Sequence, residues 1–348
     1  MPVPEVAESF SGCVNRVTLG ATKQGSSPPS AGTRSPSSPP VVLRRAGSTV
    51  TVGGARNVVY GGSIGDGGEK PLIAMDVLDS KPADWPDVLA EPYSDVLDKP
   101  GEWARKCVEE FGAQLICVKF DGIHPDKGNK DAAHAVKVTK EVLKAVGVPV
   151  ILWGCGNDEK DNQVMPKVSE AAKGENCLIG TVTEDNYKSL TAVALADGHH
   201  LITQAPLDIN IAKQVNILVS DMGFPLERIV TFQATGALGY GIEYAYSIQE
   251  RQRIAALGGD KMMAMPVICD VGYESWRAKE AKLADAPGWG AVQDRGPMWE
   301  AATAICLLQA GVDIIRMRHP RAVVTVKCFI NQVWQGEALH RIKPAFGG

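Results

Sequence analysis

Eight short apolar runs recur along the chain from residue 71 onward, and they restrict its fold more than any other feature. Most are rich in β-branched residues and continuously apolar rather than alternating, which is typical of strands covered on both faces. The runs are PLIAMDV (71–77), QLICVKF (114–120), VPVILWG (148–154), NCLIGT (176–181), HLITQA (200–205), RIVTF (228–232), MPVICDV (265–271) and VDIIRM (312–317). The pattern therefore predicts eight buried parallel strands.

Segments with helical periodicity separate these runs. EWARKCVEEFG repeats apolar residues at spacings of three and four and closes on Gly112, and residues 129–147 do the same before Pro149. Further helices are predicted at 159–173, 184–197, 208–222, 242–258, 297–310 and 319–334. Eight strands alternating with eight helices predict an α/β protein, a (β/α)8 TIM barrel. A doubly wound sheet is the alternative, but no G-x-G-x-x-G turn follows the first or second strand.

The first sixty residues have a different character. Residues 25–40, GSSPPSAGTRSPSSPP, cannot bury apolar area and are predicted to form a mobile loop. Two β-like stretches, VNRVTLG (14–20) and STVTVGG (48–54), flank this loop and could pair as a hairpin that plugs the bottom of the barrel. The predicted organisation is an N-terminal extension with a β-hairpin (1–69), a barrel (70–335) and a C-terminal tail (336–348).

Charge and hydropathy limit the classes of partner. The formal net charge is -4 and no Lys/Arg run is long enough to track a phosphate backbone, so we expect no nucleic-acid binding. No segment approaches about 20 uninterrupted apolar residues, so we expect no membrane span. The N-terminal residues lack the basic-then-apolar layout of a signal peptide, and we expect a cytoplasmic protein.

The chain has 8 cysteines, and their spacing argues against a metal centre. Iron–sulfur and zinc sites usually take at least two thiolates from one short C-x-x-C loop, a motif that is absent here. Cys117, Cys177 and Cys269 lie within apolar runs, where cysteine behaves as a small core residue. We therefore expect no metal site in this chain, and free thiols in a reducing compartment.

Polar residues follow the predicted strands, where the active sites of TIM barrels lie. They form a ring of mixed charge without a Ser/His/Asp or Cys/His set for acyl chemistry. The ring comprises Asp76, Asp79, Asp121, Cys155, Asn157, Thr181, Gln204, Asp208, Asn210, Gln233, Asp270, Tyr273, Glu274, Arg316, Arg318 and His319.

Several members of this ring have a purely structural alternative. Asp121 precedes Gly122 and either caps a turn or serves the site. Asp208 opens the DINIAKQ segment, where an N-cap role competes with a binding role. Arg318, with His319 and Pro320, either opens the last helix or serves the site. These alternatives stay open at the level of sequence.

Two segments point more strongly to function. GALGYG (236–241) has three glycines in six residues, which allows a large ligand to approach the backbone closely, and Tyr240 lies within it. Residues 272–297 are predicted to be a loop far longer than a barrel connection requires. Because this loop carries a tyrosine and two tryptophans, we expect a lid or a partner contact.

Four long motifs make the chain similar to a known family. PLDINIAKQ (206–214), GALGYGIEYAYSIQERQR (236–253), MPVICDVGYESWRAKEA (265–281) and MRHPRAV (317–323) resemble the small subunit of the corrinoid iron–sulfur protein, also known as the delta subunit of carbon monoxide dehydrogenase/acetyl-CoA synthase. The resemblance covers residues from about 70 to 335. Two features differ from the family pattern. An Asp-Pro pair is expected after the sixth strand, where this chain has TFQAT, and the 25–40 tract is longer than expected.

The resemblance implies a methyl carrier. A larger partner subunit would supply the [4Fe–4S] cluster and most of the corrinoid-binding domain. The heterodimer would carry a methyl group on cobalt from a methyltetrahydrofolate or related pterin methyltransferase to acetyl-CoA synthase/carbon monoxide dehydrogenase. The corrinoid (cobalamin) is expected between the larger subunit and this barrel's mouth. The expected contacts are Gln204, Asp208, Asn210, Gly239, Tyr240, Gly241, Tyr273 and Arg318, and no catalytic residue or metal ligand is expected.

Two other functions are weighed against this one. An active pterin-dependent corrinoid methyltransferase would need Asp or Asn groups at several strand ends, and Asn157 and Asp121 could serve while Thr181 and Gln233 could not. An aldolase-type barrel would need a Schiff-base lysine, for which Lys119 is the candidate. Asp197, Gly198 and His199 match the start of the D-x-H-x-x-G cobalt-ligand motif, but Ile202 stands in place of its glycine, so we expect His199 to be structural.

Overall fold

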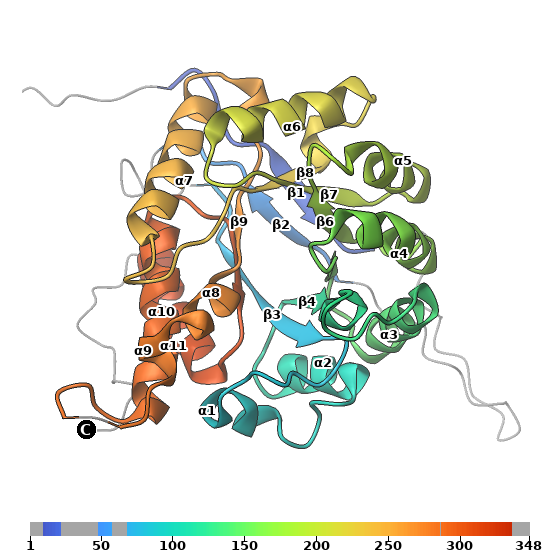
Figure 1. Ribbon diagram of the computed structural model, residues 1–348. Helices are drawn as coiled ribbons and strands as arrows, with labels where there is room; N and C mark the ends of the chain where they lie inside the picture. Colours follow the sequence, from blue (N-terminus) through green and yellow to red (C-terminus); the bar gives the residue numbers. More distant parts are fainter. Residues whose placement is uncertain (1–9, 22–47, 58–67, 286, 336–348) are drawn as a thin grey trace, which may run out of the picture.

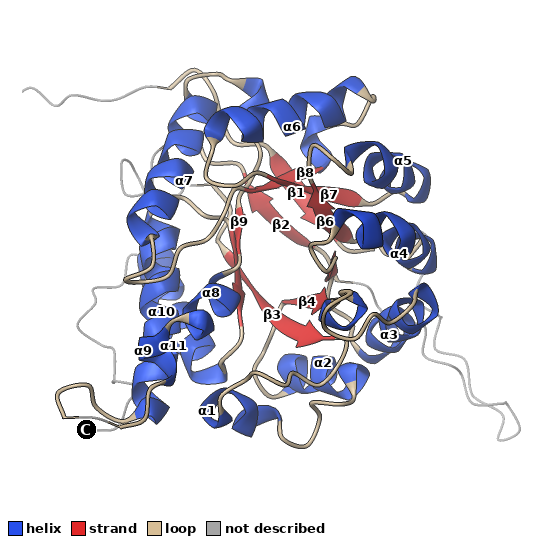
Figure 2. Ribbon diagram, viewed as in Figure 1, coloured by secondary structure: helices blue, strands red, loops and turns tan. Residues whose placement is uncertain are grey.

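The strands of the barrel follow one another around a single parallel sheet (Figures 1 and 2). The computed structural model describes residues 10–21, 48–57, 68–285 and 287–335. In sheet order the strands are β8 (Ile229–Phe232), β7 (His200–Gln204), β6 (Leu178–Val182), β5 (Val150–Trp153), β4 (Leu115–Lys119), β3 (Leu72–Leu78), β10 (Ile314–Met317) and β9 (Ile268–Cys269). The predicted TIM-barrel class is confirmed.

The barrel closes between its two end strands by a small contact. Thr231 of β8 forms a parallel bridge with Val267, and the Thr231 amide donates to the Pro266 carbonyl at 2.8 Å. All other neighbouring strands are joined by regular parallel ladders, apart from one register irregularity near Gly180. The pairing between β8 and β9 is therefore the least extensive in the barrel.

Helices surround the barrel as an outer ring (Figure 2). Asp131, Asn157 and Asp208 each cap the helix that follows with a side-chain oxygen, which explains why these helices begin there. The α-helices are α1 (Asp87–Ala90), α2 (Pro100–Glu109), α3 (Ala132–Ala145), α4 (Asp158–Ala171), α5 (Tyr187–Asp197), α6 (Ile209–Asp221), α7 (Ile242–Leu257), α8 (Val271–Arg277), α9 (Lys279–Lys282), α10 (Val292–Gln309) and α11 (Pro320–Gln335). Short 3-10 turns lie at η1 (Glu91–Tyr93), η2 (Asp121–Ile123), η3 (Leu226–Arg228) and η4 (Lys261–Met263).

Side chains alternate along each strand between the helix layer and the barrel interior. In β3, Ile73, Met75 and Val77 belong to the large core under the helices, whereas Leu72 and Ala74 belong to a separate core inside the barrel. The same alternation in the other strands fills the lower interior with aliphatic residues. The interior is thus a packed core.

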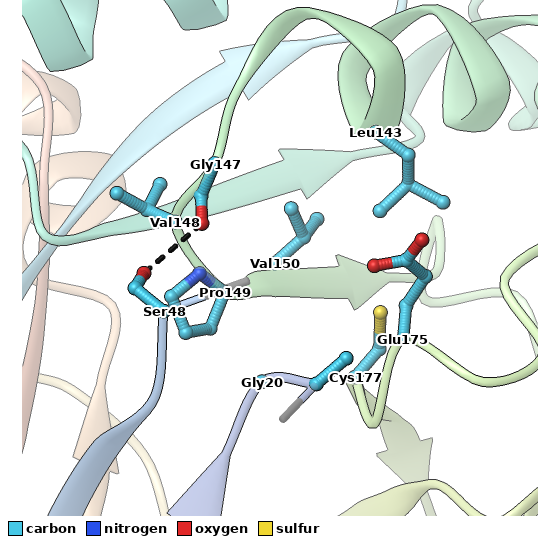
Figure 3. Close-up of a pocket in the computed structure, with 10 residues that line it drawn as sticks. Gly20, Ser48, Leu143, Gly147, Val148, Pro149, Val150, Glu175 and Cys177 are labelled. Atoms are coloured by element: carbon cyan, nitrogen blue, oxygen red, sulfur yellow. Dashed lines mark hydrogen bonds between the residues drawn. The ribbon is translucent and has the colours of Figure 1, made fainter. Parts of the chain in front are cut away.

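The predicted N-terminal hairpin is present and covers the bottom of the barrel. β1 (Arg16–Leu19) pairs antiparallel with β2 (Val50–Gly53), and Val17, Leu19 and Val52 pack into the interior core. Just before β2, the Ser48 hydroxyl donates to the Gly147 carbonyl at 3.0 Å, next to the segment that leads into β5 (Figure 3). In Figure 1 the hairpin, in blue, lies within the ring of strands.

Two sequence-based expectations around the seventh strand were wrong. The run 265–271 was predicted to be a full strand, but β9 has two residues and Val271 already begins α8. The segment 272–297 was predicted to be a long loop, but it carries α8, α9 and the first turns of α10. Pro297 lies inside α10 and cannot donate to the Gln293 carbonyl. Arg321 donates to that carbonyl instead, at 2.9 Å, so the helix can extend past the proline.

Other predictions concern parts of the chain that the structure does not describe. The 25–40 loop and the 336–348 tail lie outside the described residues, and the domain boundaries stay predictions. Within the described part of the chain, no helix combines the length and apolarity needed to cross a bilayer.

Candidate functional site

The C-terminal ends of the strands form the mouth of the barrel, where inward-facing residues become charged. β10 continues the alternation of Ile314 with Arg316 and Arg318, so both arginines lie on the interior side. Asp76 of β3 and Asp270 after β9 face the same space. All four residues are at most 7% exposed, so their charges must be balanced within the protein.

Arg316 is the centre of this buried cluster. Its Nε and Nη2 donate to the two carboxylate oxygens of Asp76, each at 3.0 Å, and its Nη1 lies 3.0 Å from Asp270 Oδ2. The guanidinium carbon is 4.1 Å from the centre of the Trp153 ring, which in turn packs edge-on against Phe232. Burial lowers the pKa of Arg316, but Asp270 and Asp76 raise it more, so the net shift is upward. Arg316 is therefore a permanent cation under the mouth.

Arg318 lies above Arg316 and is held between two aromatic rings. Its guanidinium carbon is 5.3 Å from the ring centres of both Trp85 and Tyr273, and its Nε donates to Asp76 at 3.2 Å. Arg277 contacts the Tyr273 ring at 5.1 Å. Cations stacked on aromatic rings are stabilised by the ring quadrupole, so this row of side chains fixes the guanidinium plane of Arg318.

Lys119, Asp121 and Lys127 form a second charged group at the mouth. Asp121 Oδ2 accepts from Lys127 at 3.0 Å, and Asp121 Oδ1 lies 3.8 Å from Lys119. Burial raises the pKa of Asp121, but the two lysines lower it more. Lys119 also donates to the Gly154 carbonyl. Lys119 is thus engaged by a carboxylate and a carbonyl, and nothing in these contacts favours a role as a Schiff-base lysine.

Two candidate polar residues are helix caps. The Asp208 carboxylate accepts from the Asn210 and Ile211 amides at 2.8 Å and 3.3 Å, and the Asn157 side chain accepts from the Lys160 amide at 2.9 Å. Asn210 is exposed on the first turn of α6. The capping alternative for Asp208 is therefore present in the structure, and its predicted ligand contact is untested.

The glycine loop 236–241 turns tightly before α7. Gly239 and Gly241 have φ of 73° and 84°, values that side-chain-bearing residues rarely adopt. The Tyr240 amide donates to the Ala237 carbonyl at 2.9 Å, and the Tyr240 side chain is 48% exposed. The loop lies against α10, because a Cβ at Gly239 would stand 3.8 Å from Trp299. The turn thus presents Tyr240 to solvent.

Arg295 organises the segment between α9 and α10. Although buried, it donates to the carbonyls of Glu280, Leu283, Trp289 and Gly290. In the segment held by Arg295, the side chains of Leu283 and Trp289 are 51% and 49% exposed. Exposed apolar side chains on a segment held by several hydrogen bonds favour the predicted partner contact, which stays a prediction.

The structure brings only some of the expected contacts together. Tyr273 and Arg318 touch, and Gly239, Tyr240 and Gly241 form one turn. Among the described residues, no hydrogen bond or ion pair joins Gln204, Asp208 or Asn210 to Tyr273 or Arg318. Gln204 is half-buried at the end of β7.

Other strand-end residues are structural. Gln233 is fully buried and donates to Gln252, and Thr181 is 3% exposed. His199 is buried, accepts from the Cys177 amide through Nδ1 at 3.2 Å, and contacts the Ser169 carbonyl through Nε2 at 3.0 Å. Burial lowers its pKa. His199 is therefore a core histidine, in line with the prediction.

Sequence reasoning missed several side chains that hold the charged residues of the mouth in place. Trp85, Trp153 and Glu300 were not singled out. Glu300 accepts from the Arg318 amide at 2.5 Å, the His319 amide at 3.1 Å and Trp276 Nε1 at 2.7 Å. A usable signal was present, because Arg316 and Arg318 interrupt an apolar strand with period two, and charges are rarely buried unless paired.

Comparison with known protein families decides the assignment. The sequence model of the family described as CO dehydrogenase/acetyl-CoA synthase delta subunit matches residues 40–312. The chain belongs to this family. The family resemblance noted in the sequence is thereby confirmed.

Delta subunits of two archaea are close relatives of this family member. The acetyl-CoA decarbonylase/synthase complex subunit delta of Archaeoglobus fulgidus is 37% identical over 335 residues, spanning 93% of this chain and 69% of the relative. Subunit delta 1 of Methanosarcina thermophila is 35% identical over 301 residues, spanning 81% of this chain and 68% of the relative.

Among solved structures, the delta-family barrel is similar to dihydropteroate synthases. The Xanthomonas albilineans enzyme with 4-aminobenzoic acid superposes with a TM-score of 0.52 at 12% identity, covering 79% of this chain and 95% of that one. The Yersinia pestis enzyme with a sulfonamide drug gives 0.53 at 11% identity, covering 77% and 95%. At these identities the likeness supports the TIM-barrel fold and nothing more.

The cysteines of this delta-family chain are free thiols, and four of the eight, Cys107, Cys117, Cys177 and Cys269, are buried in the core. Burial raises the pKa of Cys155, at the end of β5, to about 12. In the described part of the chain, no three His, Cys, Asp or Glu side chains converge in a way that could hold a metal ion.

Proposed function

We propose that this chain is the barrel subunit of a corrinoid-dependent methyl carrier. Membership of the delta-subunit family carries the proposal, because the relatives are named as subunits of acetyl-CoA decarbonylase/synthase complexes. In this proposal a larger subunit completes a heterodimer and holds the [4Fe–4S] cluster. Its further partners are a pterin-dependent methyltransferase and the acetyl-CoA synthase/carbon monoxide dehydrogenase. The corrinoid, when bound, carries the methyl group on cobalt.

The mouth of the barrel is the proposed resting place of the corrinoid. The segments 204–214, 236–244 and 272–290 offer polar and aromatic groups, with the exposed Asn210 and Tyr240 and the partly exposed Tyr273 as the leading contacts. Beneath these segments the charges of Asp76, Asp270, Arg316 and Arg318 balance. A polar surface whose buried charges balance suits a large ring bordered by neutral amides.

Polar atoms without partners also fit a ligand at the mouth. Asp270 Oδ1 is buried and has no hydrogen-bond partner among the described residues. Such an atom is costly unless a ligand or water satisfies it. In the loaded protein, this chain's own residues would orient the corrinoid and exclude water from the face of the ring that they cover.

The barrel is not proposed to transfer methyl groups by itself. The side chains that a pterin-dependent transferase would use are already engaged: Asn157 caps α4, and Asp121 pairs with Lys119 and Lys127. We expect the isolated chain to show no transfer from methyltetrahydrofolate to free cobalamin. Transfer at the rate of a dedicated methyltransferase, abolished by Asn157→Ala, would contradict this expectation.

Co-purification with the larger subunit tests the proposal directly. The complex is expected to show the visible spectrum of a bound corrinoid and about four irons per heterodimer. Anaerobic iron–sulfur reconstitution of this chain alone is expected to leave far less than one iron per chain. A chain that takes up about four irons by itself, and loses them when two cysteines are replaced, would overturn the proposed division of cofactors.

A bulky residue at Gly239 tests the orientation of the mouth. Gly239→Val strains the backbone at a positive φ but meets no close neighbour, because the nearest atom to its Cβ would be at 3.8 Å, so we expect it to fold with some loss of stability and to retain less corrinoid in the complex. The matched control is Gly174→Val, which also has a positive φ, lies on an exposed turn between α4 and β6 away from the mouth, and has no neighbour within 4 Å. Unchanged loading and methylation in Gly239→Val would mean that the glycine loop faces away from the corrinoid.

A further inference from the structure

A donor and an acceptor stand unpaired next to one another at the mouth. Arg318 is 5% exposed and donates through Nε to Asp76. Within the described residues, neither terminal nitrogen of Arg318 donates to a protein acceptor, and Asp76 is the carboxylate that lies within 4 Å of it. Asp270 is 7% exposed, and its Oδ1 has no partner in the same part of the chain.

The two residues directly follow neighbouring strands. β9 and β10 pair in parallel with Ile268 opposite Ile314 and Cys269 opposite Ile315, so Asp270 comes level with Arg316. Arg318 is then two residues further toward the mouth. The two side chains are near one another, because burial raises the pKa of Asp270 while the charge of Arg318 lowers it. One small ligand group at the mouth can therefore reach both.

Both side chains are held in place before any ligand arrives. The Arg318 guanidinium lies between Trp85 and Tyr273, and the Arg318 amide and carbonyl are bound by Glu300 and Tyr93. The Asp270 amide donates to Thr235 at 2.7 Å, and its Oδ2 pairs with Arg316. A ligand therefore meets a fixed donor and a fixed acceptor, at a small cost in side-chain entropy.

We infer that Arg318 and Asp270 together recognise a primary carboxamide. The amide carbonyl accepts from the terminal nitrogens of Arg318, and the amide NH2 donates to Asp270. Resting on the proposed function, the ligand group is one of the carboxamide side chains at the edge of the corrin ring. This pair thereby distinguishes amide side chains from acid ones.

The charge of the cluster favours an amide over a carboxylate. Arg316 and Arg318 already balance Asp76 and Asp270, so a carboxylate would add an uncompensated negative charge beside Asp270. A carboxylate also lacks the N–H that Asp270 Oδ1 needs. A neutral amide satisfies both unpaired groups and leaves the charge balance unchanged.

The space beneath the mouth favours a side-chain amide over a pterin ring, although the lactam edge of a pterin offers the same C=O and N–H groups. Arg316 and Trp153 fill the interior directly below, at 0% and 4% exposure, and Phe232 packs against Trp153. A bicyclic ring would have to displace these side chains, whereas a side-chain amide reaches the pair from the rim.

The assembled complex with its larger subunit provides the test. It is loaded either with the native corrinoid or with derivatives in which single side-chain carboxamides have been hydrolysed to carboxylates, and the corrinoid retained after gel filtration is read from the visible spectrum. At one ring position the acid derivative is expected to be retained about tenfold less well, because it leaves Asp270 unpaired. Equal retention of every acid derivative would overturn the inference. A complex that retains no corrinoid at all would instead contradict the proposed function.

Asp270→Asn assigns the effect to this pair. Its side-chain amide can donate to a carboxylate, so the preference at that one ring position should shrink or reverse, while Asp294→Asn, an exposed carboxylate paired with Arg321, should keep the wild-type preference. If Asp270→Asn does not assemble, Arg318→Lys removes the paired donors and should lower retention of the native corrinoid. An unchanged preference in the assembled Asp270→Asn complex would contradict the inference. A second result would also contradict the inference. In it, the unloaded wild-type complex binds free pterin, the native corrinoid displaces that pterin, and all acid derivatives are retained equally.

Discussion

At the scale of single residues, Arg316 dominates the interior of the mouth. Its guanidinium is 0% exposed and contacts two carboxylates and an aromatic face. A buried charge is tolerated only while its partners remain, because its desolvation is compensated by them alone. The mouth is therefore rigid for electrostatic reasons as much as for reasons of packing.

Asp76→Asn is expected to destabilise the fold strongly. The change keeps the size of the side chain but leaves Arg316 with Asp270 alone and Arg318 with no carboxylate, so we expect a loss of about 3–5 kcal/mol in the free energy of unfolding. Urea unfolding followed by circular dichroism measures the loss. Glu141→Gln, which breaks an exposed pair with Lys137 on α3, is the control and should cost less than about 0.5 kcal/mol. Equal midpoints for Asp76→Asn and the control would refute this account of the cluster.

At the scale of elements, Glu300 joins three parts of the mouth. From α10 its carboxylate accepts N–H groups from α8, through Trp276, and from the β10–α11 junction, through Arg318 and His319. Burial raises the pKa of Glu300 to about 7, although these three hydrogen bonds lower it. The junction that positions Arg318 and α8 thus contains a group that titrates near neutral pH.

Glu300 gives the protein a pH-dependent stability that Glu300→Gln should remove. The pKa is about 7 in the folded chain against 4.5 for an ordinary glutamate, so between these values the folded state binds more protons than the unfolded state. The contribution of Glu300 to the free energy of unfolding therefore falls as pH rises from about 4.5 to about 7. Unfolding measured at about pH 5 and about pH 8 should show wild type losing stability relative to Glu300→Gln.

The control for this experiment is Glu250→Gln, which changes an exposed carboxylate on α7 and should follow the wild-type protein at both pH values. A difference between wild type and Glu300→Gln that stays constant with pH would show that Glu300 does not titrate in this range.

Helices and strands with a regular hydrophobic pattern could be predicted from the sequence, whereas the short β9, the helices α8 and α9 and the start of α10 could not. MPVICDV reads as a strand because its residues are apolar, but pairing with β10 uses only Ile268 and Cys269, and a helix starts at Val271. The start of α10 was missed because Pro297 reads as a helix boundary, and the hydrogen bond that compensates it comes from Arg321, distant in sequence.

The candidate site was predictable in place but not in detail. Strand ends locate the mouth of any such barrel, and most of the residues now found there follow predicted strands. Which of them touch depends on register between β9, β10 and β3, a property of the folded sheet. Sequence reasoning could therefore name Arg318 and Tyr273 as site residues, but it could not name Trp85 and Glu300.

At the scale of the whole molecule, the hairpin β1–β2 completes the interior core. Leu19 is 0% exposed among the aliphatic side chains of the barrel floor, whereas its neighbour Thr18 points outward. Leu19→Ala should therefore lower the free energy of unfolding by about 2–5 kcal/mol. Thr18→Ala, the control, should change it by less than about 1 kcal/mol, because it removes an exposed hydroxyl pair with Thr51. Similar losses for both variants, measured by urea unfolding, would mean that the hairpin does not seal the floor.

The hairpin also has a bearing on how the chain assembles. It makes hydrogen bonds with Gly147, Asn176 and Ala264, which belong to units spread over more than half of the barrel's circumference. During synthesis the hairpin leaves the ribosome before any of these units, yet its binding surface exists only once the strands around it are in position. A segment that is made before the units it contacts can dock only after them, so Val17, Leu19 and Val52 gain their apolar partners late in folding.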